Sequence, residues 1–472
     1  MGDLLHALTA CAAVDRLRQG DLSPSELIAA LEQRVEAVNP ALNALPTTCF
    51  ERARKRAAAL EKLPPGERGG LAGLPVPIKD SYEVEGVRTT WGSLAFSDHI
   101  ATRSDYCVEA IEAAGGIVYA KSNTPEFEAG ANTFNEVFGA TRNPWDTTRS
   151  AAGSSGGAAA AVATGMAFIA QGSDFACSVR YPAAFCNVVG LRPSPGLVPQ
   201  GPNALPFQVL SVIGPLARTV EDVALGLDGL ARFDRRDPLS RPASPATFRT
   251  AAMTGERPKR AAFSLDLGIA RVARPVRTTV ERAIAKLAAA GLAVEGAHPD
   301  LGLADGAFRT LRAFQFAALR HDVLQAERAK LKPEVVWNIE QGLKLTAAEI
   351  ALAEARRAQS RRAMLTFLDT HDVLIAPAAP VEPFPVTERF VSEIDGEKLE
   401  TYLDWLLLGY AVTVCGCPSI SIPCGLSDNG LPVGLQIIGK PYGEGALLAA
   451  AAWCESVLGA SLTRPIEPRE AA

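Results

Sequence analysis

The sequence of 472 residues lacks any uninterrupted apolar run near the roughly 18 residues that suggest a membrane span. Its first residues, MGDLLHALTACAA, include the acidic Asp3 and no basic segment, so we expect no secretory leader. Basic residues are not in excess either, since 47 Lys and Arg stand against 52 Asp and Glu and the formal net charge is −5. These absences argue against membrane and nucleic-acid partners and favour a cytoplasmic protein.

The cysteine count is odd, at nine, and free thiols in a reducing compartment are the simplest interpretation in a long chain without a leader. Cys415 and Cys417 form only a Cys-x-Cys pair with no histidine nearby, so we expect no metal site there. The glycine-rich tract GSSGG is not followed by a lysine, so it does not fit a phosphate-binding loop. We therefore expect neither a metal nor a cofactor.

Helical and strand patterns alternate along most of the chain, and 48% hydrophobic with 21% charged residues suits a large core. The alternation predicts an α/β fold, organised as one large domain or several smaller ones. The clearest predicted elements are a capped helix opened by Ser23-Pro24-Ser25-Glu26, a helix over 106–114 leading into the strand IVYA, a loop over 232–260, a following βαβ-like stretch, and a helix over 346–369.

Three polar residues, Lys79, Ser154 and Ser178, stand where short apolar runs meet glycine-rich or proline-bounded turns. Their separations are 154 − 79 = 75 and 178 − 154 = 24 residues. Residues 156–165 predict a helix about 15 Å long, and residues 167–171 predict a buried strand that returns about 17 Å. Because these lengths nearly cancel, we expect Ser154 and Ser178 at one edge of a sheet.

A serine hydroxyl needs a neighbouring base to act as a nucleophile near neutral pH. Lys79 is the nearest candidate, because the apolar run LPVPI should deliver it to the same sheet edge. Burial beside Val76 and Ile78 would lower the pKa of Lys79 and favour the neutral amine that accepts a proton. Activity should then rise toward alkaline pH. The histidines all lie outside these tracts: His6, His99, His298, His321 and His371.

In their order and spacing, these tracts resemble the amidase signature family, whose members are serine hydrolases that cleave carbon–nitrogen bonds with a Lys-Ser-Ser triad. The resemblance covers most of the chain, and both separations within the triad fit the family pattern. It implies a large mixed sheet flanked by helices on both faces and a small-molecule amide substrate. The matching tracts are LSPSELIAALEQRVEAVNPALNAL, KSNTPEF, FGATRNPW, AAGSSGGAAAAVATG, CSVRYPAAFCNVVGLRPSPG and GLPVGLQIIGKPYGEGALL.

Carried over by position, the resemblance makes Ser178 the nucleophile, Ser154 a bridging serine on a cis peptide bond, and Lys79 the base. Lys79 would draw a proton through Ser154 from Ser178, which would attack the substrate carbonyl. Ser154 would pass the proton to the departing amine, and water would hydrolyse the acyl-enzyme by the reverse relay.

The resemblance places an oxyanion hole at the backbone N–H groups of Phe175, Ala176, Cys177 and Ser178. The family usually has two glycines where this chain has Ala176 and Cys177. A side chain at a position that needs positive φ would cost about 1–2 kcal/mol. The loop therefore has either a different backbone or a narrower, more apolar pocket above the scissile bond.

Supporting roles are also implied for residues around the triad. Ser155 would be a hydrogen-bond partner of the triad, and Asp174 with Arg180 would form an ion pair that holds the nucleophile loop. Ala151 and Ala152 stand where the family usually has proline and glycine.

Other interpretations stay open. GSSGG also fits the nucleophile elbow of an α/β-hydrolase-like esterase using Ser155, although the turn-rich residues before it do not predict the required strand. Cys177 could serve as a thiol nucleophile in place of Ser178, although buried cysteines more often behave as small apolar residues. The family also contains the glutaminase subunit of a transfer-RNA-dependent amidotransferase, and a non-catalytic binding relative is a further alternative.

The expected substrate is an aryl or aliphatic amide or anilide, with a carbamate, urethane or ester as chemically similar alternatives. We expect residues 1–472 to form a single amidase domain, with a core over 60–230 that carries the triad and a variable segment over 231–400 that shapes substrate entry. Chain length is compatible with a monomer or a homodimer. The aromatic residues expected to line an apolar pocket are Phe134, Phe138, Phe175, Phe207, Trp337 and Tyr402.

Overall fold

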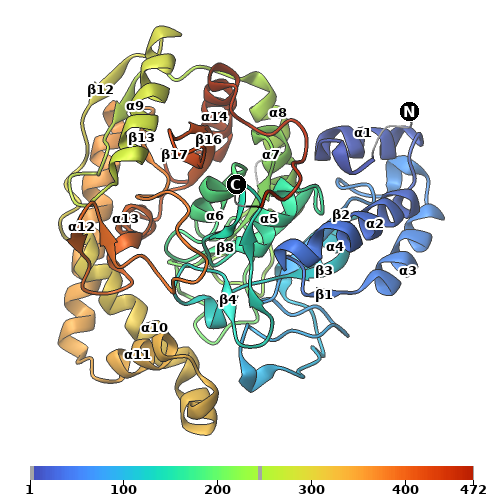
Figure 1. The fold of residues 1–472 in the computed structure, drawn as a ribbon, viewed down its shortest axis with the longest axis horizontal. Coiled ribbons are helices and arrows are strands. Elements are labelled where there is room, and N and C mark those ends of the chain that lie inside the picture. Colours follow the sequence, from blue (N-terminus) through green and yellow to red (C-terminus); the bar gives the residue numbers. More distant parts are fainter. Residues whose placement is uncertain (1–4, 243–246, 471–472) are drawn as a thin grey trace.

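A large mixed sheet of eight strands forms the centre of the protein, seen in a computed structural model that describes residues 5–242 and 247–470 (Figure 1). β11 pairs in parallel with both of its neighbours, and all other pairs in this sheet are antiparallel. In spatial order the strands are β12 (Val294–Gly296), β11 (Ala261–Phe263), β13 (Val373–Pro377), β17 (Pro432–Ile438), β16 (Ser419–Leu426), β9 (Val189–Arg192), β10 (Val212–Ala217) and β8 (Ile169–Asp174).

Helices surround this sheet and make up most of the periphery (Figure 1). No helix among the described residues combines the length and the apolar character that crossing a membrane would require. The helices are α1 (Ala10–Gln19), α2 (Pro24–Leu42), α3 (Phe50–Glu61), α4 (Tyr106–Ala113), α5 (Gly156–Ala163), α6 (Arg180–Cys186), α7 (Val220–Leu230), α8 (Phe248–Thr254), α9 (Arg274–Ala289), α10 (Ala304–Glu327), α11 (Pro333–Leu343), α12 (Ala347–Thr370), α13 (Leu407–Cys415) and α14 (Glu444–Leu458).

Both faces of the sheet are covered by helices, as the family resemblance implies. A Cβ added at Gly434 in β17 would meet Ala184 of α6, whereas one added at Gly439, just beyond β17, would meet Leu447 of α14. Because successive side chains along a strand point to opposite faces, these two helices lie on opposite sides of the sheet. The large mixed α/β sheet predicted from the family is confirmed.

A second, smaller sheet has the order β1 (Thr47–Thr48), β3 (Ile117–Ser122) and β2 (Pro75–Lys79). The expectation that the run before Lys79 joins the same sheet as the nucleophile segment is therefore wrong. The two sheets nevertheless meet, because the backbone N–H of Lys79 donates to the Gln171 side chain on β8 at 2.9 Å. This contact across two sheets, rather than one continuous sheet edge, brings Lys79 to the end of β8.

Three short hairpins complete the strands: β4 (Phe134–Asn135) with β5 (Gly139–Ala140), β6 (Arg142–Asn143) with β7 (Asp146–Ser150), and β14 (Glu393–Ile394) with β15 (Glu397–Lys398). The strand β7 occupies residues that we expected to be turn. It ends before the GSSGG tract, which leaves residues 151–155 outside any helix or strand.

Helix signals in the sequence predict the structure well where the capping residues are present. Ser23 and Thr346 each open a helix with a reciprocal capping box. The predicted loop over 232–260 is partly wrong, because it contains α8, whose Thr247 accepts a cap hydrogen bond from Thr250 and whose Phe248 is buried. Residues 243–246 of that predicted loop lie outside the described residues, as do residues 1–4 of the N-terminal segment in which we expect no leader.

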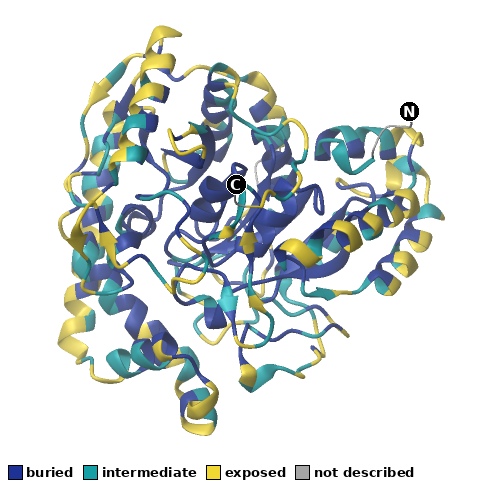
Figure 2. Cartoon of the chain, viewed as in Figure 1, coloured by how far each residue is buried: buried dark blue, intermediate teal, exposed yellow. Residues whose placement is uncertain are grey.

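α5 and α6 lie in the interior, coloured as fully buried in Figure 2, while the outer helices expose one face. α5 is made of glycine, alanine and valine and has no exposed residue. Such small side chains allow a close approach of backbones: a Cβ at Gly157 would lie 2.4 Å from the Asn123 nitrogen and 2.5 Å from the Ala44 oxygen. This close approach fixes the segment that begins with Ser154.

We expect Gly157→Ala to lower the free energy of unfolding by about 1–3 kcal/mol or more, because the added methyl group would meet backbone atoms that have no room to move. Urea unfolding followed by circular dichroism measures the change. Gly296→Ala is the matched control, since its Cβ would meet nothing within 4 Å. Equal stability of the Gly157→Ala variant and the wild type would contradict this account of the helix contact.

Candidate active site

Lys79 is fully buried at the end of β2, and three oxygen atoms surround its Nζ. Nζ lies 2.6 Å from Ser154 Oγ, 2.9 Å from Ser173 Oγ and 2.7 Å from Glu128 Oε1. Burial is the strongest influence and lowers the pKa of Lys79, while the Glu128 carboxylate opposes that effect. The site therefore holds a lysine whose proton is more easily removed than that of a solvated lysine.

Ser154 lies just before α5, and the peptide bond between Gly153 and Ser154 is cis. A Cβ at Gly153 would approach backbone atoms of Ala131 and Asn132 to within 2.9 Å, so the loop is closely packed there. Ala152 has a φ of 54°, a left-handed conformation that costs a residue with a side chain about 1–2 kcal/mol. Ala152 stands where the family usually has glycine, and it adopts this left-handed conformation at a cost.

Ser178 lies in the loop between β8 and α6, two residues before the helix begins, and 5% of its surface is exposed. The backbone N–H of Ser155 donates to the Ser178 carbonyl at 3.1 Å, which joins the two serine loops. Within residues 5–242 and 247–470, the Ser178 hydroxyl makes no hydrogen bond. The structure thus contains a hydrogen bond between Lys79 and Ser154, whereas the Ser178 hydroxyl has no partner among the described residues.

The loop over 175–178 adopts a backbone that tolerates side chains. Neither Ala176 nor Cys177 has a positive φ, so replacing the usual glycines causes no left-handed strain. Cys177 is completely buried, and its Cβ is the nearest neighbour, at 2.5 Å, of a Cβ built at Gly409 in α13. Among the described residues, the backbone N–H groups of 175–178 donate no hydrogen bond. These donors are available to an external acceptor.

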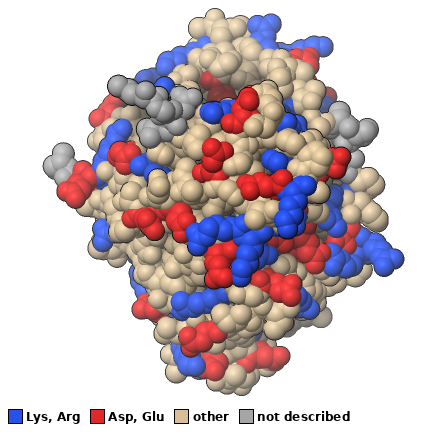
Figure 3. Space-filling model, turned by 90° about the vertical axis from the view of Figure 1, so that its right-hand side faces the viewer, with Lys and Arg blue, Asp and Glu red and all other residues tan. Residues whose placement is uncertain are grey.

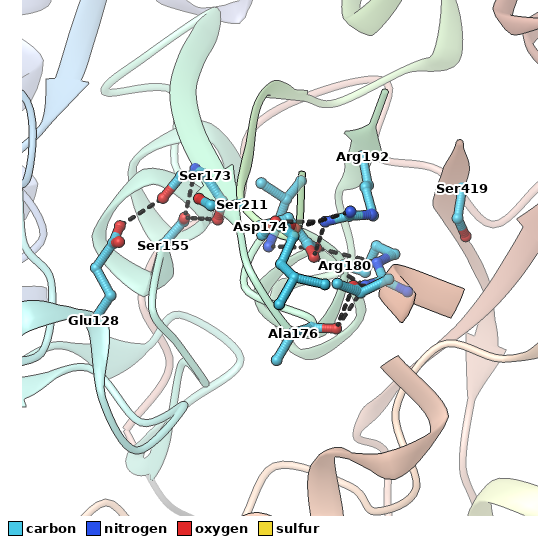
Figure 4. Close-up of polar contacts among 12 residues, drawn as sticks. Glu128, Ser155, Ser173, Asp174, Ala176, Arg180, Arg192, Ser211 and Ser419 are labelled. Atoms are coloured by element: carbon cyan, nitrogen blue, oxygen red, sulfur yellow. Dashed lines mark hydrogen bonds and ion pairs between the residues drawn. The ribbon is translucent and has the colours of Figure 1, made fainter. Parts of the chain in front are cut away.

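Asp174, at the end of β8, is buried between two guanidinium groups (Figure 4). Arg180 Nη2 lies 2.9 Å from Asp174 Oδ1, and Arg192 Nη1 lies 3.2 Å from the same oxygen. Burial raises the pKa of Asp174, but the two arginines outweigh it and hold the pKa at about 2. Arg180 also donates to the Ala176 carbonyl at 2.7 Å, so the predicted ion pair is present and is tied to the nucleophile loop.

Glu128 and Ser173, which were not among the residues predicted from the sequence, complete the surroundings of Lys79. Ser173 Oγ donates to Glu128 Oε1 at 2.5 Å, and Figure 4 shows Glu128 pointing toward Ser173. Glu128 ends a short 3-10 turn in which Phe127 and Glu128 have φ values of 46° and 62°. No recognisable motif in PEFEAG signals that this carboxylate reaches Lys79.

Ser155 and Cys177 are poorly placed to act as nucleophiles. Ser155 is fully buried, and its Oγ lies 3.4 Å from both the backbone nitrogen and the backbone oxygen of Ser173. No histidine in the described part of the chain hydrogen-bonds to Ser155. Burial and the nearby Asp174 raise the pKa of the Cys177 thiol well above its usual value, which disfavours a thiolate. In residues 5–242 and 247–470, no cluster of His, Cys, Asp and Glu is arranged to hold a metal ion.

A cavity of about 380 Å³ adjoins this site and reaches it at Glu128 and Phe175. Its wall is mixed in character rather than apolar, with charged side chains from the segment 81–105 and from α10. The residues that line it are Ser81, Tyr82, Glu83, Trp91, Arg103, Asp105, Phe127, Glu128, Phe175, Gln200, Gly201, Pro202, Asn203, Ala204, Gln208, Ser211, Arg312, Gln315, Phe316, Leu319 and Arg320.

Of the aromatic residues predicted to line a pocket, only Phe175 lies in the wall of this cavity. The other five lie elsewhere in the structure. Phe207 is 75% exposed, Phe134 contacts Lys332 and Arg389, Phe138 contacts Arg88, Trp337 packs against Tyr402, and Tyr402 is buried with its hydroxyl bonded to Arg312.

We expect Asp174→Asn to lower the free energy of unfolding at neutral pH by about 3–5 kcal/mol, because it leaves two buried arginines without their counter-ion. Since the folded pKa lies below that of an unfolded Asp, the wild-type contribution is present above about pH 4 and is lost as the pH falls toward 2. Urea unfolding at several pH values measures both effects. An Asp174→Asn variant with the same acid dependence as the wild type would refute the assignment.

The chain is similar in sequence to known proteins over almost its whole length. The family model described as Amidase matches residues 26–448. The chain is 36% identical over 458 residues to an acylamidase of Rhodococcus erythropolis, with 96% of each chain covered. It is 34% identical over 479 residues to one of the subunits of the glutamyl-tRNA(Gln) amidotransferase of Moorella thermoacetica, covering 95% of this chain and 96% of the relative.

Solved structures agree with this assignment. A bacterial aryl acylamidase of the amidase signature enzymes aligns with a TM-score of 0.90 at 29% identity, covering 96% of both chains. A peptide amidase from Stenotrophomonas maltophilia aligns with a TM-score of 0.80 at 27% identity, covering 98% of both chains. The chain therefore belongs to the amidase signature family and is an amidase.

Proposed function

We propose that the protein is a serine amidohydrolase that cleaves a carboxamide through an acyl-enzyme on Ser178. The observation that carries this proposal is the buried 2.6 Å hydrogen bond between Lys79 Nζ and Ser154 Oγ, beside the loop that presents Ser178. The likeness to an acylamidase and to an aryl acylamidase supports an acyl amide or anilide as the substrate. Carbamates and esters present a similar carbonyl to the same nucleophile.

In the proposed reaction, neutral Lys79 accepts the Ser154 proton while Ser154 takes the proton of Ser178. The Ser178 oxygen bonds to the substrate carbonyl carbon and forms a tetrahedral oxyanion. On collapse the carbon–nitrogen bond breaks, and Ser154 delivers a proton to the departing amine, with Lys79 restoring the Ser154 proton. Water then adds to the acyl-enzyme by the same relay, which releases the acid and regenerates Ser178.

Charge on the oxyanion would be stabilised by the open backbone N–H groups of residues 175–178. Each such donor typically contributes about 2.7–4 kcal/mol to the transition state. The Asp174 carboxylate, through Arg180, holds the Ala176 carbonyl and so orients the loop. Ser155 supports the same loop by binding the Ser178 carbonyl through its backbone.

The glutaminase component of a transfer-RNA-dependent amidotransferase is the second candidate, because a relative from such an enzyme is similar over nearly the whole chain. The two functions differ in what the isolated chain can do. Hydrolysis of simple anilides without partner proteins favours the amidohydrolase, whereas hydrolysis confined to glutamine favours the second candidate.

The net charge of −5 and the nine cysteines fit a cytoplasmic protein, monomeric or homodimeric, without nucleic-acid partners. All nine cysteines are unpaired, as is usual in reducing compartments. The face drawn in Figure 3 has acidic and basic side chains interspersed, with no broad basic patch of the kind that binds nucleic acid.

Ser178→Ala should reduce turnover of an anilide by at least about 10⁴-fold and abolish labelling by a fluorophosphonate probe, because the attacking oxygen is lost. The measurements are initial rates and mass spectrometry of the labelled protein. Cys177→Ala, which removes the neighbouring buried thiol, should retain most turnover and labelling. The reverse outcome would assign the nucleophile to Cys177.

Glu128→Gln should move the alkaline-rising limb of kcat/KM to lower pH, because the neutral amide no longer stabilises the charged form of Lys79. The other charged group acting on Lys79 is Asp174, which is neutralised by its arginines. A pH–rate profile measures the limb, and Ser173→Ala controls for loss of a hydrogen bond without loss of charge. An unmoved limb in Glu128→Gln would show that Lys79 does not set the pH dependence.

A further inference from the structure

We propose that α10 provides a carboxylate-binding subsite in the cavity, so that the preferred amide substrates carry a carboxylate remote from the scissile bond. This inference rests on the proposed amidohydrolase function. Arg312 and Arg320 would bind the carboxylate, and Gln315 between them would add a hydrogen-bond donor. The aromatic residues of the sequence suggest an apolar substrate, whereas this subsite would select amides that carry a carboxylate.

One face of α10 forms a wall of the cavity. The lining residues Arg312, Gln315, Phe316, Leu319 and Arg320 recur at spacings of three, four, seven and eight residues from Arg312, which places them on the same side of a helix. Both guanidinium groups therefore belong to the same wall, separated by about two helical turns. The helix is a rigid support for such a site.

The acidic residues of the cavity are already engaged or partly neutralised. Glu83 pairs with His99 at 2.9 Å and with Arg103 at 3.7 Å, and Glu128 pairs with Lys79. Burial raises the pKa of Asp105 to about 7, so a substantial share of that carboxyl is protonated at neutral pH. None of these carboxylates lies within ion-pair distance of α10.

Arg312 is held as a rigid cation with only 4% of its surface exposed. Its guanidinium lies 4.4 Å from the Phe316 ring centroid and 5.2 Å from that of Phe175, and Nη2 donates to the Tyr402 hydroxyl at 3.0 Å. Within residues 5–242 and 247–470 it has no carboxylate partner, and its buried Nε makes no hydrogen bond. Phe175 connects this cation directly to the loop that ends in Ser178.

Arg320, further along the helix, is half-buried and also lies against an aromatic ring. Its guanidinium lies 4.6 Å from the Phe127 ring centroid, and its one hydrogen bond to the described residues is a long contact of 3.5 Å to the Leu319 carbonyl. Burial lowers the pKa of Arg320, although a guanidinium remains charged at neutral pH. The Glu128 carboxylate acts on Arg320 only at long range, without an ion pair, and Arg312 is buried without a carboxylate partner, so a bound anion would offset the cost of these charges.

A carboxylate is the anion that best fits these two groups. The planar fork of a guanidinium matches the two oxygens of a carboxylate, and charge-assisted bonds of this kind are the stronger ones. The cavity of about 380 Å³ is sized for a small molecule. With the amide carbonyl at Ser178 and the carboxylate on α10, the substrate would span the cavity between the nucleophile loop and the helix.

The test compares two anilides of equal chain length, the mono-4-nitroanilide of glutaric acid and the 4-nitroanilide of pentanoic acid. Wild type should prefer the carboxylate substrate, and Arg320→Gln and Arg312→Gln should each lower its kcat/KM by about 10–100-fold, mainly through KM. The loss should be larger for the carboxylate substrate than for the uncharged anilide in both variants, because only the former makes the ion pair. Arg328→Gln is the control, since this arginine is exposed and paired with Glu340.

A second measurement uses the wild-type protein alone, and its calorimetric part does not depend on turnover. Glutarate should bind the wild-type protein in calorimetry and compete with the anilide substrate, whereas uncharged pentane-1,5-diol should do neither. Equal turnover of both anilides together with no glutarate binding would overturn the subsite while leaving the amidohydrolase intact. If neither anilide is hydrolysed and Ser178 is not labelled, the proposed function fails, and glutarate binding alone then decides the subsite.

Discussion

The burial of the Lys79 amine among oxygen atoms is the constraint on which the site depends. A buried ammonium is costly, so burial favours the neutral amine, while a carboxylate 2.7 Å away favours the charged form. The balance between these effects sets how readily the lysine gives up and takes back a proton. Ser154 Oγ lies 2.6 Å from Lys79 Nζ, so it can hydrogen-bond to the amine in either protonation state.

The loop over 175–178 depends on a second buried charge. Asp174 ends β8 and is the common partner of Arg180 and Arg192, which come from the following helix and from β9. One carboxylate thus ties the edge strand of the large sheet, the loop over 175–178 and the next helix into one unit. Because every group in this cluster is buried, the geometry is rigid and depends little on ionic strength.

Local sequence information was sufficient for the elements that carry the proposed triad. The alanine-rich helix and the short strand after it have lengths that follow from composition, and they do place Ser154 near Ser178. The same information could not place β2 in a separate sheet or reveal that Glu128 reaches Lys79. That contact depends on left-handed backbone at Phe127 and Glu128, for which neither residue type has a preference. The aromatic residues failed as guides to the pocket, because the packing of α10 against distant segments decides which side chains face the cavity.

Cysteine burial has a practical consequence for work on this enzyme. Eight of the nine thiols are buried, and only Cys49 is partly accessible. Alkylating reagents can therefore reach most of them only when the chain opens, even though one of them directly precedes Ser178. Inactivation by such reagents would therefore report transient opening of the fold rather than attack on the reaction centre. The rate of inactivation would measure how often the fold opens.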